Sequence, residues 1–215
     1  MSFYFCEFIS QIFFADKGIQ MIRKKISTLL LLLTVFPLLC QAAGIKGKVT
    51  VDGEELKDAV IYLESNKNER YTPPSKPVIL DQKDLTFVPH VLPVLVGSTV
   101  AFPNSDPTRH SVFSPGKTKK FDFGTYAQGA QKSITFENPG VVPLLCHVHP
   151  EMSAFIVVVE TPYFAVSDEN GYYQIKNVPK GKYKIIIWHE WAKPQSRTID
   201  VDEGKDLNIN FSLDE

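Results

Sequence analysis

Short runs of β-branched and aromatic residues recur along the chain, separated by Gly, Pro, Asn and Asp, and almost no helical periodicity interrupts them. Typical runs are IKGKVTV at 45–51, DAVIYLE at 58–64, SAFIVVVE at 153–160 and KYKIIIWHE at 182–190. Short strands at regular spacing with turn residues between them are typical of sandwiches and barrels. The sequence therefore predicts an all-β chain.

One turn signal is specific enough to predict a hairpin. Asn170 and Gly171 separate the run FAVSDE from the run YYQIKNV. Both residues tolerate the positive φ that two-residue hairpin turns require. We therefore expect these two runs to pair with each other.

The N-terminal region has the layout of an export signal. From Met21 the chain has three basic residues at 23–25, an apolar run at 26–39, and small residues at Ala42 and Ala43. An apolar run of this length is short for a membrane span and is typical of a secretory signal peptide. We expect export to a bacterial periplasm, with Met21 as the true start and cleavage after Ala42 or Ala43. A retained N-terminal membrane anchor is the alternative.

Cleavage of the leader changes the charge balance and the cysteine count of the chain. The chain has 23 basic and 24 acidic residues, and the expected leader holds four of the basic and two of the acidic ones. The mature chain is therefore mildly acidic without a basic block, so nucleic acid is not an expected partner. It keeps a single cysteine, Cys146, which cannot form an internal disulfide, and a free thiol in an oxidising compartment is a liability unless something occupies it.

The stretch LLCHVHPEM at 144–152 places this cysteine beside His147, His149 and Met152, the only methionine left after cleavage. An inert buried thiol would explain the cysteine alone, but not the methionine and two of the five histidines beside it. A thiolate, two imidazoles and a weakly bound thioether are the ligands of a blue-copper electron-transfer centre. One local histidine supplies one imidazole, and His110, in the turn-rich segment FPNSDPTRHSVF, is the best source of the other.

Two local histidines compete for that imidazole position. His147 follows Cys146 directly, and successive side chains of a strand point to opposite faces, so His147 is expected to point away from a metal bound by Cys146. His149 lies past the expected strand end, where Pro150 helps the chain to curl back. The residues therefore favour His149 without excluding His147.

Two separate segments resemble the halves of one known sandwich. GKVTVDGEELKDAVIYLE at 47–64 and AVSDENGYYQIKNVPKGKYKIIIWHE at 165–190 are similar to carboxypeptidase regulatory-like, transthyretin-like domains. The matching positions are turn glycines and core aromatics, so the resemblance implies a scaffold rather than an activity. Neither segment is large enough to bury a core alone, so we expect the two to pair with each other.

The segment between them resembles a cupredoxin of the plastocyanin and amicyanin type. It is more similar still to methylamine-utilisation-type proteins with F-P-N-S-D-x-x-x-H and C-x-x-H-P-E-M motifs. The resemblance implies one type 1 copper ion with His110, Cys146, His149 and Met152 as ligands. In these families asparagine usually follows the first histidine, whereas Ser111 stands here. A serine hydroxyl can still donate a hydrogen bond, so the substitution affects the expected reduction potential rather than copper binding.

The predicted organisation is a Greek-key cupredoxin sandwich at residues 76–161, inserted in or flanked by a smaller transthyretin-like β-sandwich. The smaller sandwich would combine residues 44–75 with residues 162–215, behind a leader at residues 1–43. We expect no membrane span in the mature chain.

The expected function is that of an exported type 1 (blue) copper protein, which carries single electrons between a cytochrome or dehydrogenase and another redox partner. The alternatives are a periplasmic copper carrier or storage protein, and an envelope scaffold module with a structural copper site. An enzyme is not expected, because four protein ligands leave no open metal position for a substrate.

Overall fold

The computed structural model describes residues 42–65 and 69–214, so the expected export signal, including Met1 and Met21, lies outside the described residues. The described residues form strands and turns and no helix, which confirms the all-β prediction. Among these residues, accordingly, no helix has the length and apolar character needed to cross a membrane.

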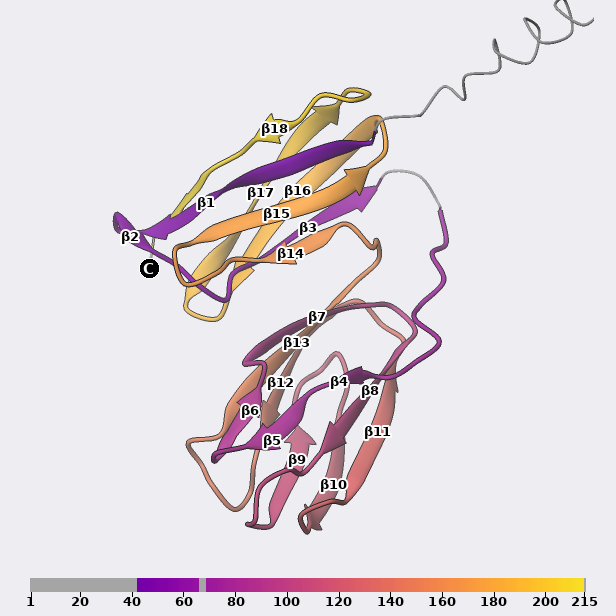
Figure 1. Cartoon of the computed structure of the whole chain (residues 1–215), viewed down its shortest axis with the longest axis vertical. Helices are drawn as coiled ribbons and strands as arrows, with labels where there is room; N and C mark the ends of the chain where they lie inside the picture. The colour runs from indigo at the N-terminus through magenta and orange to yellow at the C-terminus, as the bar shows by residue number, and fades with distance from the viewer. Residues whose placement is uncertain (1–41, 66–68, 215) are drawn as a thin grey trace, which may run out of the picture. The chain divides into compact units, whose positions relative to one another are not determined.

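Strands from both ends of the described chain combine into one sandwich, here called the flanking sandwich (Figure 1). In its first sheet, β1 (Ala43–Val51) pairs with β2 (Glu54–Glu55), β15 (Tyr172–Val178), β18 (Leu207–Asn208) and β19 (Phe211–Leu213). The second sheet has the order β14 (Phe164–Val166), β3 (Val60–Ser65), β16 (Gly181–His189) and β17 (Ala192–Val201). Strands before residue 66 therefore pair with strands after residue 163, as the two sequence resemblances require.

The core of the flanking sandwich follows from alternation along its strands. Ile45 and Val49 on β1 face Ile61 and Leu63 from β3, and all four side chains are fully buried. Successive side chains of a strand point to opposite faces, so one face of each sheet is buried and the other is available for polar residues. This is the pattern that the sequence runs predict.

The hairpin predicted around Asn170 and Gly171 does not form as expected. A tight turn is present, because Gly171 has φ of 74° and the backbone N–H of Asp168 donates to the carbonyl of Tyr172 at 2.9 Å. However, β14 before the turn pairs with β3, whereas β15 after it pairs with β1 in the opposite sheet. The turn therefore carries the chain between the layers of the sandwich rather than between paired neighbours.

The central segment forms a second sandwich, here called the central sandwich (Figure 1). One sheet has the order β10 (Phe121–Tyr126), β9 (His110–Ser114), β12 (Gly140–Leu145), β13 (Ser153–Val159) and β7 (Val91–Leu95). The other has the order β11 (Gln131–Phe136), β8 (Ser98–Pro103) and β4 (Val78–Ile79), and a short ribbon pairs β5 (Asp81–Lys83) with β6 (Thr86–Val88). Phe102, Val112 and Leu144 are fully buried in the core between the strands.

Candidate metal centre

Two neighbouring strands place the predicted ligands at one end of the central sandwich. β9 begins with His110, and β12 ends one residue before Cys146. Leu145 at the end of β12 pairs with Phe113 on β9, so the two ligand-bearing chain segments lie side by side. Ordinary sheet pairing therefore brings His110 and Cys146 together although they are 36 positions apart in the sequence.

The loop after Cys146 returns the chain to the same place. The backbone N–H of Met152 donates to the carbonyl of His149 at 3.0 Å, which closes a turn just before β13. The Met152 side chain is almost completely buried and belongs to the same apolar cluster as Cys146. Both sulfur-bearing side chains of the loop thus enter the core of the central sandwich.

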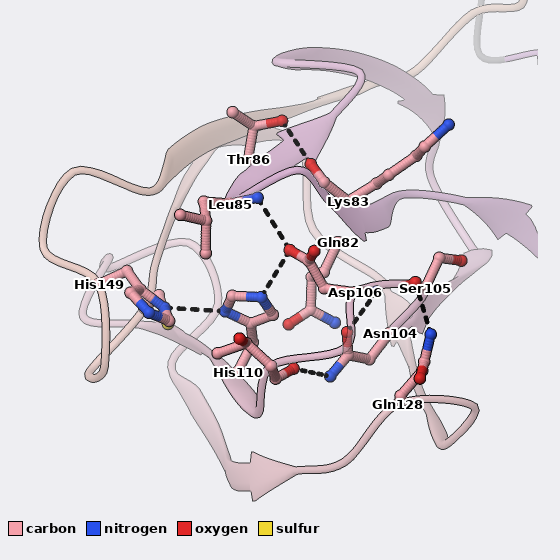
Figure 2. Close-up of polar contacts among 12 residues, drawn as sticks. Gln82, Lys83, Leu85, Thr86, Asn104, Ser105, Asp106, His110, Gln128 and His149 are labelled. Carbon is pink, nitrogen blue, oxygen red and sulfur yellow. Dashed lines mark hydrogen bonds and ion pairs between the residues drawn. The ribbon is translucent and has the colours of Figure 1, made fainter.

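Three of the predicted ligands offer their donor atoms to one point. One ring nitrogen each from His110 and His149 and the sulfur of Cys146 all lie within 4.8 Å of one another. The two Nδ1 atoms are 3.0 Å apart. Figure 2 marks this contact between the two rings with a dashed line. Two nitrogens bound to one ion at about 2.0 Å each would be about 3 Å apart at an angle near 100°. The spacing therefore fits two imidazoles on a single ion.

The chemistry of the donor atoms also favours particular metal ions. Cys146 and His110 are buried, whereas His149 is partly exposed. Thiolate and imidazole donors suit copper and zinc, and a thioether such as that of Met152 is a soft ligand that favours copper over zinc. The residues present thus fit a copper ion with a solvent-facing histidine.

His147, two residues after the end of β12, is not part of the cluster of predicted ligands. Its ring is about half exposed and stacks on Phe113, with ring centroids 3.8 Å apart and an interplanar angle of 2°. Its Nε2 is 2.9 Å from a carboxylate oxygen of Asp122. The contacts of His147 are therefore with β9 and β10, away from the cluster of ligand atoms.

Ser111, which stands in place of the usual asparagine, links the two ligand-bearing segments. Its buried hydroxyl donates to the sulfur of Cys146 at 3.7 Å. The same oxygen accepts the backbone N–H of His147 at 2.8 Å. Ser111 therefore supplies both a donor to the thiol sulfur and a tie between β9 and the loop after β12.

Asp106, which the sequence pattern does not single out, contacts the predicted ligand His110. Its carboxylate oxygen Oδ2 is 2.8 Å from Nε2 of His110 and is buried with it. The pKa of Asp106 is held below its ordinary value, mainly because the backbone N–H of Leu85 donates to the carboxylate; burial opposes this effect and His110 adds to it. The only sequence signal was its place four residues before His110, in a loop where spacing does not predict side-chain contacts.

Buried Asn104 fixes the shape of that loop. Its side-chain amide donates to the carbonyls of Thr108 and Tyr126, at 2.9 Å and 3.1 Å. Its side-chain oxygen accepts the backbone N–H of Asp106 at 3.0 Å. The hydrogen bonds of Asn104 thus hold the segment PNSD before His110 in a shape that places the Asp106 carboxylate beside Nε2 of the imidazole (Figure 2).

A comparison with family models matches residues 151–214 to the carboxypeptidase regulatory-like domain. The match covers the second part of the flanking sandwich and confirms that resemblance for this part of the chain. It starts before β13, a strand that pairs in the central sandwich. A comparison with curated proteins finds no match.

Among solved structures, the chain is similar to a Cu-containing nitrite reductase from Thermus scotoductus SA-01, with 28% identity over 43% of this chain and a TM-score of 0.38. The match spans only 26% of the nitrite reductase. A reduced variant of amicyanin is 19% identical over 46% of this chain and 99% of its own, with a TM-score of 0.38. A purple cupredoxin from Nitrosopumilus maritimus is 26% identical over 35% of this chain and 84% of its own, with a TM-score of 0.33.

Proposed function

We propose that the protein is an exported type 1 (blue) copper protein that carries single electrons between redox partners. The observation that carries the proposal is the cluster of two imidazole nitrogens and one cysteine sulfur within 4.8 Å, at the edge of a closed β core. Cys146, His110 and His149 would hold the ion, and Met152 would provide the weak axial contact that is typical of such centres. When bound, copper supplies one-electron chemistry between its cupric and cuprous states.

The surrounding protein favours electron transfer over substrate chemistry. Three ligands and Met152 come from one strand start and one short loop, both anchored in the same sandwich, so the donor atoms are held in place. A fixed ligand set needs little rearrangement when the charge of the ion changes. His149 is the partly exposed member, and Val148 beside it is 44% exposed, so this edge is the route by which a partner would approach.

We also propose a cellular location and redox partners for the protein. The export signal expected at residues 1–43 would place the protein in a bacterial periplasm, and a cytochrome or dehydrogenase would exchange electrons with it. The proposal does not include catalysis of a substrate reaction, since four protein ligands would leave no open position on the ion.

The visible spectrum of the copper-loaded protein tests the proposal. We expect an intense charge-transfer band from the Cys146 thiolate to the cupric ion, reversible voltammetry and rapid electron exchange with a soluble cytochrome. A colourless protein would refute the type 1 site. A blue protein that passes copper to a metal-free acceptor protein but exchanges no electrons would instead support the copper carrier or storage function.

The Ser111 hydroxyl gives a second prediction. Because it donates to the Cys146 sulfur, it stabilises negative charge on the thiolate and weakens donation to the cupric ion. Ser111→Ala is therefore expected to lower the reduction potential. A hydrogen bond of about 1 kcal/mol corresponds to about 40 mV for one electron, which is the upper limit for this long contact. Voltammetry of the wild type and of Ser111→Ala measures the shift. A higher potential in Ser111→Ala would contradict the role of the hydroxyl as a donor to the Cys146 sulfur.

A further inference from the structure

Oδ2 of Asp106 accepts two hydrogen bonds. The backbone N–H of Leu85 donates to it at 2.8 Å, and Nε2 of His110 lies at the same distance from it (Figure 2). Asp106 is only 6% exposed and His110 is fully buried, so bulk water does not screen this contact effectively. A carboxylate is an acceptor only, so the proton between the two side chains belongs to Nε2 of His110 when Asp106 is ionised.

The Leu85 amide reaches Asp106 because of an unusual turn. Asp84 and Leu85, which join β5 to β6, have φ of 53° and 57°. A bulky residue such as leucine rarely adopts a positive φ, so the backbone is strained at this position. Strained backbone of this kind persists where the surrounding structure requires it. Here the turn directs a backbone donor at a carboxylate that contacts a predicted metal ligand.

The consequence for His110 is a fixed tautomer. With Nε2 protonated and bonded to Asp106, Nδ1 keeps its lone pair and faces Nδ1 of His149 at 3.0 Å. Nδ1 is therefore the nitrogen of His110 that is free to bind a metal. A carboxylate on the far nitrogen also makes an imidazole a stronger ligand.

We propose that Asp106, held by the β5–β6 turn, is the positioning residue that locks His110 in its metal-binding tautomer and lowers the reduction potential of the centre. The proposal rests on the proposed copper function. A buried negative charge near the ion stabilises the cupric state more than the cuprous state, because the cupric ion carries the larger charge. The effect on potential thus comes from charge, and the effect on tautomer comes from the hydrogen bond.

Two variants separate these effects. Asp106→Asn removes the charge but retains a side-chain oxygen that can accept from both Leu85 and His110. Asp106→Leu removes the charge and the acceptor together. Asp122→Asn is the matched control, since Asp122 also pairs with a histidine near the site, but this pair is about half exposed and its charge is screened by water.

Voltammetry and competition with chelators test the charge effect. For Asp106→Asn we expect a 10- to 100-fold loss of cupric affinity at nearly unchanged cuprous affinity. Each tenfold loss corresponds to a rise in potential of about 59 mV for one electron. Asp122→Asn is expected to shift the potential by much less. A shift in Asp106→Asn no larger than in this control, in a protein that retains its copper band, would overturn the charge role.

The tautomer is read in the metal-free protein, from the ¹⁵N shifts of the histidine rings. We expect His110 to be protonated at Nε2 in the wild type and in Asp106→Asn, and to lose this preference in Asp106→Leu. Protonation at Nδ1 in the wild type would overturn the positioning role. If the wild type gives no copper band, the proposed function fails, and the tautomer measurement alone then decides whether Asp106 positions His110.

Discussion

Cys146→Ser is expected to abolish the intense visible band of the copper-loaded protein. The band requires a thiolate that donates charge to the cupric ion, and a serine hydroxyl neither ionises near neutral pH nor supplies a soft sulfur donor. His110 and His149 remain within reach of an ion, so weak copper binding without strong colour is the expected state. We expect at least a tenfold loss of absorbance per bound copper, measured beside metal analysis of the same samples.

His147→Ala is the matched control from the same stretch. His147 adjoins Cys146, but its ring stacks on Phe113 and pairs with Asp122 at the surface. Loss of an exposed pair of this kind costs between about 0 and 1 kcal/mol, so the fold and the band should both persist. A variant without His147 that loses its colour, or a Cys146→Ser protein that keeps it, would contradict the ligand assignment.

Much of the fold and of the ligand set can be predicted from the sequence, because it depends on the alternation of side chains along a strand. Burial of every second residue along β1 follows from its apolar pattern, and strand alternation at Cys146 and His147 predicts that their side chains diverge. The same rule cannot say which sheet a strand joins. The turn at Gly171 shows this limit, because turn chemistry fixes the bend but tertiary burial sends β14 and β15 to opposite layers.

The environment of His110 was less predictable than its role. The contact with Asp106 depends on a loop shaped by Asn104 and on a turn in which Leu85 has a positive φ. Leucine is disfavoured at such positions, so its own preference argues against the turn that is observed. Interactions that depend on several irregular backbone positions at once leave no periodic trace in a sequence.

Gly47→Ala is expected to destabilise the flanking sandwich by about 3 kcal/mol, near the upper end for overpacking a core. Gly47 lies on β1 and faces the core side, between the fully buried Ile45 and Val49. A Cβ at this position would collide with the backbone carbonyl of Ile209 and would also lie 3.1 Å from the ring of Tyr173.

The Ile209 carbonyl cannot move aside without losing other bonds. It accepts the hydroxyl of Tyr173 at 2.7 Å, and the N–H of Ile209 donates to the carbonyl of Lys46 at 2.8 Å. Relief of the collision would therefore separate β1 from the segment that links β18 to β19. An alanine methyl costs most where its neighbour is hydrogen-bonded backbone, because such backbone cannot rotate away as a flexible side chain can.

Urea unfolding followed by tryptophan fluorescence measures this loss. The chain has two tryptophans, Trp188 on β16 and Trp191 just beyond it, and both belong to the flanking sandwich. Trp188 also packs against Phe155 of β13, so the transition is followed by circular dichroism as well. Gly44→Ala on the same strand is the control, because its Cβ would meet the carboxylate of Asp206 at 3.0 Å rather than backbone. This carboxylate accepts the N–H of Gly44 at 2.8 Å, but it is an exposed side chain that can shift slightly. We expect this control to change stability by no more than about 0.5 kcal/mol. Equal losses in the two variants would show that the Ile209 carbonyl yields easily, and that close approach is not the reason for glycine at position 47.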